Sequence, residues 1–144
     1  MLGQKLSGAL ERHTLLLSEY HCAQNLQGDF FTWNISNLSS FDVYILDIGF
    51  SSRKFPLLAT YFGEFRLFPM SNAAEIKILG RSQAEPNVNA VFPIKLSSRN
   101  SIVLATSNIL KIADAHDEGC RYMFVSTACG YFCAIKVQAF EPNL

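Results

Sequence analysis

The 144 residues of this chain suffice for one domain with a sizeable core, and 49% hydrophobic against 17% charged residues excludes a disordered chain. Because 12 basic residues balance 12 acidic ones, the net charge of +0 gives no basis for general affinity for nucleic acid or anionic membranes. No apolar run reaches the roughly 18 residues of a transmembrane helix, and charges interrupt the place of a signal-peptide core. We therefore expect a cytoplasmic protein without nucleic-acid or membrane partners.

The segment from Leu2 to Leu26 has the residue spacing of an amphipathic helix. Its apolar stripe consists of Leu2, Leu6, Leu10, His13, Leu17 and Tyr20. These positions recur every three or four residues, and most polar side chains lie away from them. Since Asn25 and Gly28 supply stop signals, we expect residues 1–28 to form one helix. It would pack on the rest of the protein or on the same helix of a second copy.

After Asp29 the apolar pattern is typical of β-strands, with a period of two. The predicted strand segments are 30–36, 42–50, 59–68, 74–80, 91–96, 101–113 and 120–140. The segment 101–113 is either a hairpin hinged at Ser107 and Asn108 or one bent strand. The segment 120–140 is long enough for a hairpin that turns at Cys129 and Gly130.

Two of these strands carry particular predictions. In 42–50, simple alternation assigns one face to Tyr44, Leu46, Ile48 and Phe50. Because Val43 and Ile45 are apolar on the other face, we expect this strand to be central in its sheet. In 59–68, alternation points Tyr61, Phe65 and Leu67 inward.

Eight or nine short strands after one helix predict a mainly β protein. The architecture is either an antiparallel β-sandwich or a closed barrel of about eight strands. The all-β domain spans 29–140, and the tail 141–144 is expected to fray. The run from Asn34 to Ser39 contains two consecutive glycosylation sequons, which we interpret as a turn signal because no secretory signal is evident.

An acidic turn is predicted at 114–119, and it contains His116. Together with Cys120, Cys129 and Cys133, this histidine offers the nitrogen and sulfur donors that zinc binds. No pair of them has the two-residue spacing of a zinc knuckle, and free thiols in a cytosolic chain usually behave as small hydrophobic residues. His116 and Cys120 are thus candidate metal ligands, while the sequence favours a solvated turn and no cofactor.

The candidate ligand-binding residues are Arg53, Lys54, Arg81, Trp33 and Tyr61. In a meander, alternate loops emerge at the same end, which would bring the three cations together, with Arg99 at the opposite end. Such a cluster can hold a phosphate or carboxylate. Aromatic residues such as Trp33 and Tyr61 could instead line an apolar pocket inside a barrel. The implied ligand is small and either anionic or apolar.

No nucleophile elbow, phosphate loop or zinc-protease motif is present, so the sequence argues against an enzyme. Low charge, strands that are apolar on both faces and an isolated helix favour a non-enzymatic protein-interaction or self-assembling β-domain that forms a homo-oligomer. The alternatives are a small-molecule-binding barrel with an aromatic-lined pocket and a small metal-dependent enzyme around His116.

Overall fold

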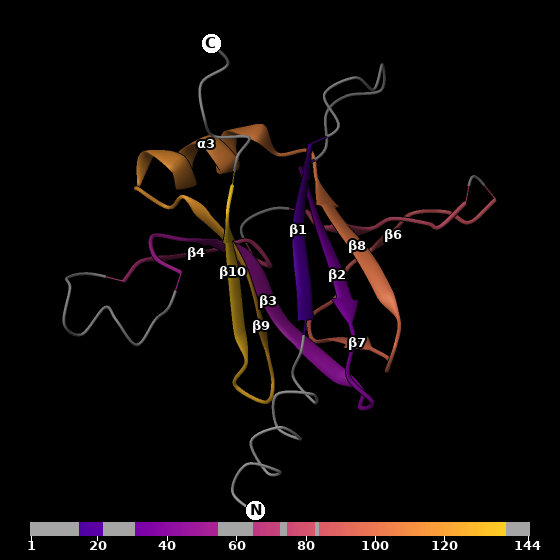
Figure 1. The fold of residues 1–144 in the computed structure, drawn as a ribbon. Helices are drawn as coiled ribbons and strands as arrows, with labels where there is room; N and C mark the ends of the chain where they lie inside the picture. The colour runs from indigo at the N-terminus through magenta and orange to yellow at the C-terminus, as the bar shows by residue number, and fades with distance from the viewer. Residues whose placement is uncertain (1–14, 22–30, 55–64, 73–74, 83, 138–144) are drawn as a thin grey trace, which may run out of the picture.

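The computed structural model describes residues 15–21, 31–54, 65–72, 75–82 and 84–137. In this part of the chain, two five-stranded antiparallel sheets pack face to face as an open sandwich (Figure 1). The predicted mainly β, antiparallel architecture is therefore confirmed. The closed barrel is wrong, because each sheet keeps its own edge strands.

The first sheet has the strand order β1-β2-β8-β5-β6. Its strands are β1 (Leu15–His21), β2 (Phe31–Asn37), β8 (Ser101–Thr106), β5 (Lys77–Ile78) and β6 (Val88–Asn89). The second has the order β10-β9-β3-β4, and β7 pairs with the other half of β3. Its strands are β10 (Phe132–Lys136), β9 (Tyr122–Thr127), β3 (Val43–Ser51), β4 (Leu67–Pro69) and β7 (Ile94–Leu96). We call these sheet A and sheet B; β3 is central in sheet B, as predicted.

The predicted N-terminal helix is wrong where the structure describes it, because residues 15–21 form β1. This strand pairs with the whole of β2, from Leu15 opposite Asn37 to His21 opposite Phe31. Leu15 and Leu17 are buried whereas Leu16 is exposed, which is the period of a strand. The three consecutive leucines fit the residue spacing of a helix as well as that of a strand, and the pairing of this segment with β2 selects the strand. Residues 1–14 and 22–30 lie outside the described part.

The helix that the structure does describe is α3 (Ile109–Asp117), where a strand and an acidic turn were expected. The Asn108 side chain caps its start by accepting a hydrogen bond from Lys111 N at 3.1 Å. At its end, Gly119 has φ +86°, and Cys120 N donates to Ala115 O at 3.0 Å. This is the Schellman arrangement, which requires a residue such as glycine after the helix. The predicted strand 101–113 therefore ends as β8 at Thr106.

Three aromatic side chains lie at the centre of the sandwich. Phe31 contacts Trp33 and Phe50 with ring centroids 5.0 and 5.2 Å apart, and Trp33 lies 5.5 Å from Phe50. Phe31 and Trp33 come from sheet A and Phe50 from sheet B, so these contacts hold the two layers together. Trp33 is fully buried, and its indole N–H has no hydrogen-bond partner.

A β-bulge in β3 changes which side chains point into the core. The pairing with β9 shifts between Ile45 and Asp47. Asp47 Oδ1 accepts hydrogen bonds from Ile48 N at 2.8 Å and from Ser71 N at 3.3 Å, which stabilises the irregular backbone. Val43 and Ile45 are buried before the bulge, and Ile48 and Phe50 after it. The predicted single face of Tyr44, Leu46, Ile48 and Phe50 is therefore wrong.

Two chain crossings between the sheets meet at one end of the sandwich. The β2–β3 loop runs from sheet A to sheet B, and the β7–β8 turn runs back. The buried Asn37 amide donates to Phe41 O at 2.7 Å and to Leu96 O at 3.1 Å. Its oxygen accepts from Ser39 N at 3.0 Å. Asn37 thus joins both crossings. The interpretation of this run as a turn signal holds for its end, from Asn37 to Ser39, whereas residues 34–36 lie within β2.

The predicted hairpin at Cys129 and Gly130 is confirmed, since β9 and β10 are joined by a turn in which Gly130 has φ +86°. The predicted strand 59–68 lies mostly outside the described residues. In its described part the side chains point the opposite way to the prediction, since Leu67 is exposed and Phe68 packs against the core.

Candidate functional site

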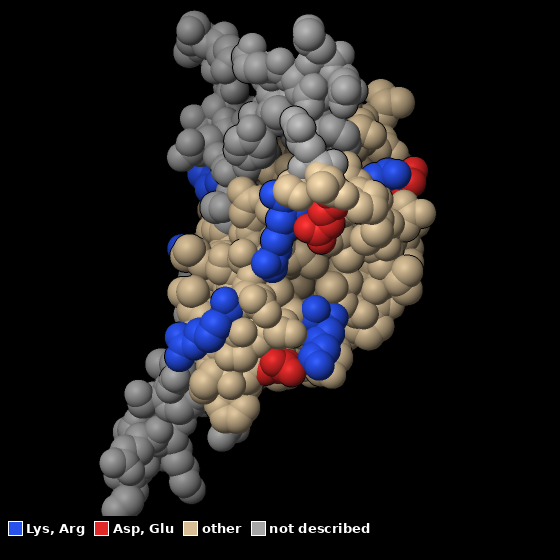
Figure 2. Space-filling view, turned by 90° about the vertical axis from the view of Figure 1, so that its right-hand side faces the viewer, with Lys and Arg blue, Asp and Glu red and all other residues tan. Residues whose placement is uncertain are grey.

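A cleft of about 750 Å³ opens on the flank where β5 and β8 of sheet A approach β7 of sheet B. It is lined by residues 78–81, Glu85, 95–97 and 100–103. Figure 2 looks onto this flank and shows basic (blue) and acidic (red) side chains around a largely uncharged area. The volume is in the range of small-molecule sites.

The cleft exists because β5 leaves the sheet after two paired residues. Leu79 N still donates to Val103 O at 2.9 Å, but the chain turns away at Gly80. A Cβ atom at Gly80 would overlap the carbonyl oxygen of Glu85, so the turn requires glycine. Further along β8, a side chain replaces the missing strand as a hydrogen-bond partner: Arg81 Nη2 donates to Ser101 O at 2.9 Å.

The charged groups at the cleft include two cations, Arg81 and Lys95. Lys95 Nζ lies 3.5 Å from Asp42 Oδ2, and both side chains are about half exposed. The Asp42 carboxylate also accepts a hydrogen bond from Ser98 N at 2.9 Å. That bond, helped by Lys95, lowers the pKa of Asp42. Glu85 Oε2 accepts from the backbone N–H of Arg81 at 3.2 Å.

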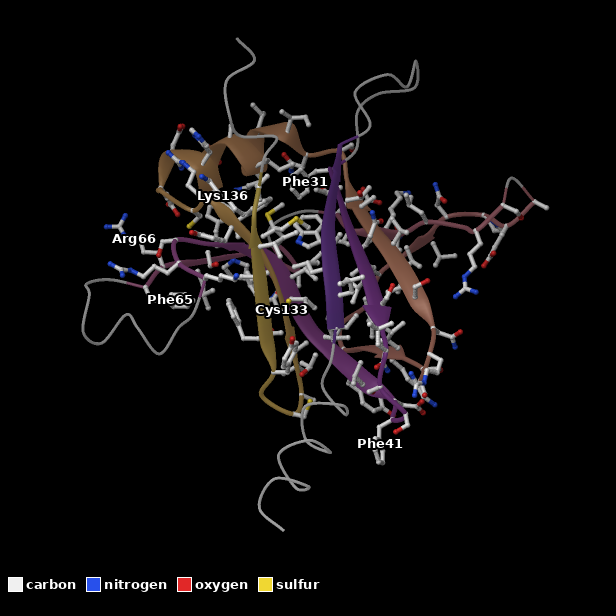
Figure 3. All side chains as sticks on the ribbon, in the orientation of Figure 1. Phe31, Phe41, Phe65, Arg66, Cys133 and Lys136 are labelled. Carbon is white, nitrogen blue, oxygen red and sulfur yellow. The ribbon has the colours of Figure 1, made fainter. Side chains whose placement is uncertain are left out.

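A second unusual surface is the outer face of sheet B. Tyr44, before the bulge, and Leu46, at the bulge, point away from the core and are 46% and 47% exposed. After the bulge the same face is covered, because Phe124 lies over Gly49 and stacks on Phe132 with centroids 5.1 Å apart. Figure 3 shows Phe65 on this outer side of the molecule, and its ring lies 5.8 Å from that of Phe132. One half of the sheet B face thus exposes large apolar side chains to solvent, next to Lys95.

The structure does not bring the candidate ligand residues together. Arg53 and Lys54 follow the end of β3, where Ser51 Oγ donates to Arg53 O at 2.8 Å, whereas Arg81 lies at the cleft. Burial raises the pKa of the Cys133 thiol, and a hydrogen bond with Tyr131 and the charge of Lys54 oppose this rise. Trp33 is packed in the core and does not line the cleft.

Two of the remaining predicted positions can be placed briefly. Tyr61 lies outside the described residues. Arg99 has φ +63° at the tip of the β7–β8 turn and donates from Nη1 to Leu38 O at 2.7 Å.

The candidate metal ligands lie in different environments and have different neighbours. His116 is half-buried on α3, with Nδ1 3.8 Å from Asp117 Oδ1. Cys120 is buried, burial raises its pKa, and its thiol lies 3.9 Å from Arg66 O. Cys129 is exposed on the β9–β10 turn. Within the described ranges, no group of three or more His, Cys, Asp or Glu residues is placed to hold a metal ion.

Sequence reasoning missed Lys95 and Asn100 as cleft residues. The available signal was Pro93 in the short predicted strand 91–96, because a proline within a strand indicates a sheet edge, where side chains such as Lys95 border open space. Pairing of β7 with β3 and of β8 with β5 could not be read from that pattern.

None of the described helices is of a length and apolarity that would let it cross a membrane. No protein-family model, curated protein or solved structure matches this chain.

Proposed function

We propose that this protein is a non-enzymatic, self-associating β-domain that forms a homo-oligomer through the outer face of sheet B. The observation that carries this proposal is the exposure of Tyr44 and Leu46 on β3, with Leu46 at the bulge itself. Large apolar side chains that share one sheet face and remain half exposed are typical of contact surfaces. Phe41, 50% exposed at the lower tip of the β2–β3 loop, extends the same apolar end of the molecule (Figure 3).

The charges next to this face suit a second copy of the same chain. Lys95 is the cross-strand neighbour of Tyr44, and Asp42 forms an ion pair with Lys95. In a two-fold contact each surface meets itself, so a face that carries one charge of each sign can pair Asp42 of one copy with Lys95 of the other. The net charge of +0 adds no long-range repulsion between copies.

Sedimentation equilibrium of the wild type and two variants tests the proposal. At about 20 μM we expect the wild type to have a mass of at least two chains of 16.1 kDa each. Leu46→Glu places a charge in the proposed contact and should give a monomer, because an unpaired buried charge is costly. Leu110→Glu is the matched control: Leu110 is 79% exposed on α3, away from this face, and this variant should still associate.

Far-ultraviolet circular dichroism checks that each variant is folded. A wild-type monomer at 200 μM refutes self-association. If the oligomer persists in Leu46→Glu but dissociates in Leu110→Glu, the contact is not formed by the outer face of sheet B.

A further inference from the structure

We infer that the cleft between β5, β8 and β7 binds a small amphipathic anion, namely a carboxylate or phosphate group attached to a short apolar body. This site is separate from the proposed contact surface, since the two are formed by different strands and only Lys95 borders both. Three features of the cleft support this ligand class: its cations, its neutral polar groups and its apolar lining.

Arg81 is well placed to bind an anion. Its Nη2 bond to Ser101 O fixes the guanidinium at the cleft and uses one of five N–H groups. The carboxylate of Glu85 also lines the cleft, where its Oε2 accepts from the backbone N–H of Arg81 and keeps a negative charge near the guanidinium. A guanidinium that is held by a backbone carbonyl loses little further freedom when it binds a carboxylate or phosphate.

Lys95 supplies a second cation from the opposite wall. Its contact with Asp42 is an exposed ion pair at 3.5 Å, and pairs of this kind contribute little because water and salt screen them. An anion in the cleft can therefore share this ammonium group at small cost. Ser97 and Asn100 add neutral polar groups at the β7–β8 turn.

The apolar part of the lining indicates that the ligand is more than a simple ion. Ile78 and Ile102 are only half-buried, although both belong to the core-facing side of sheet A, where Ile35 pairs with Ile102. Leu96 closes the opposite side. Apolar surface left half-covered inside a cleft gains free energy, roughly 25 cal/mol per Å², when an apolar group covers it.

Titrations followed by ¹H–¹⁵N chemical shifts test the inference with four probes. Hexanoate and hexyl phosphate carry both required features, whereas hexanol lacks the charge and acetate lacks the apolar body. We expect at least one of the two anionic hexyl probes to shift the amide signals of Ser101 and Val103, and to bind at least tenfold more tightly than either control. The better of the two anions identifies the head group.

Variants then assign the binding to the two cations. Lys95→Gln should weaken the binding of the better probe roughly tenfold, since it removes a hydrogen bond between two charged groups. Arg81→Gln should weaken it at least as much, but Lys95→Gln is the cleaner test because its side chain holds no loop in place. Lys77→Gln is the matched control, because Lys77 lies on β5 outside the cleft lining and is paired with Glu75 at 3.6 Å.

The inference fails if neither anionic hexyl probe shifts these signals at 10 mM. It also fails if hexanol or acetate binds as tightly as the hexyl anions, or if Lys95→Gln and Lys77→Gln have equal effects. Because Lys95 also borders the proposed contact, Arg81→Gln, which changes the cleft alone, separates this result from that of sedimentation.

Discussion

Replacing Asn37 by alanine tests how much the joined crossings contribute to stability. In the wild type this side chain donates to Phe41 O and Leu96 O and accepts from Ser39 N. After the change, Phe41 O keeps the hydroxyl of Ser39, at 2.9 Å, as a donor. Leu96 O and Ser39 N lose the amide as their side-chain partner. A buried polar group left unsatisfied costs about 1–3 kcal/mol, so two such groups give a loss of about 3 kcal/mol in the free energy of unfolding.

Urea unfolding followed by tryptophan fluorescence measures this loss, because the single tryptophan, Trp33, is fully buried and becomes exposed on unfolding. Asn34→Ala is the matched control: Asn34 lies on the same strand but is half-buried on the opposite face, and its loss should change the free energy by less than about 0.5 kcal/mol. If Asn37→Ala costs no more than Asn34→Ala, the side chain does not stabilise the crossings and the reasoning is wrong.

Gly49→Ala should destabilise the fold by about 1–3 kcal/mol, because the new methyl group overlaps Phe68 O and pushes β4 away; an unchanged melting temperature would contradict this. The pKa of Asp42 is below its usual 3.8 in the folded state, so its stabilising effect is present at neutral pH and is lost as the pH falls through that folded-state value. The urea midpoint of Asp42→Asn should therefore lie below that of the wild type at pH 6 and approach it at pH 3, and a constant difference would argue against the assignment. In a Cys22→Ser background, the exposed Cys129 should give a fast phase with a thiol reagent in the native protein, and this phase should vanish in Cys129→Ser.

The strand pattern was readable from the sequence wherever one face of a strand is buried along its whole length. Residues 31–37 and the hairpin at Gly130 are of this kind, and alternation located them to within a few residues. In β3 the pattern failed because Asp47 introduces a bulge, which changes the parity of every later side chain. An acidic residue inside an otherwise apolar strand was the visible sign of that irregularity.

The two errors about helices have different physical origins. Residues 15–17 carry no information that separates the two periods, and only the partner strand β2 selects the extended form. For α3 the local signals were present: Asn108 is a strong N-cap residue and Gly119 a strong C-terminal one. Those signals were overlooked because the apolar cluster from Ile109 to Ile112 was interpreted as a continuation of β8.

The cleft could not be predicted, since it depends on which strands become neighbours. Arg81 was identified as a candidate cation, but its expected companions Arg53 and Lys54 lie at the end of β3. Its actual companion, Lys95, comes from β7, and the pairing of β7 with the middle strand of sheet B is a long-range contact. Local patterns do not specify such contacts.

The buried state of the Asn37 amide has a practical consequence for how the protein is produced. The sequence Asn37-Leu38-Ser39 is an acceptor for oligosaccharyltransferase, an enzyme that acts on chains before they fold. A sugar attached to that nitrogen would occupy the space in which Leu96 O is bound, and it would remove one of the two amide hydrogens. Expression through a eukaryotic secretory pathway would therefore yield misfolded material, and a bacterial or cell-free host avoids the problem.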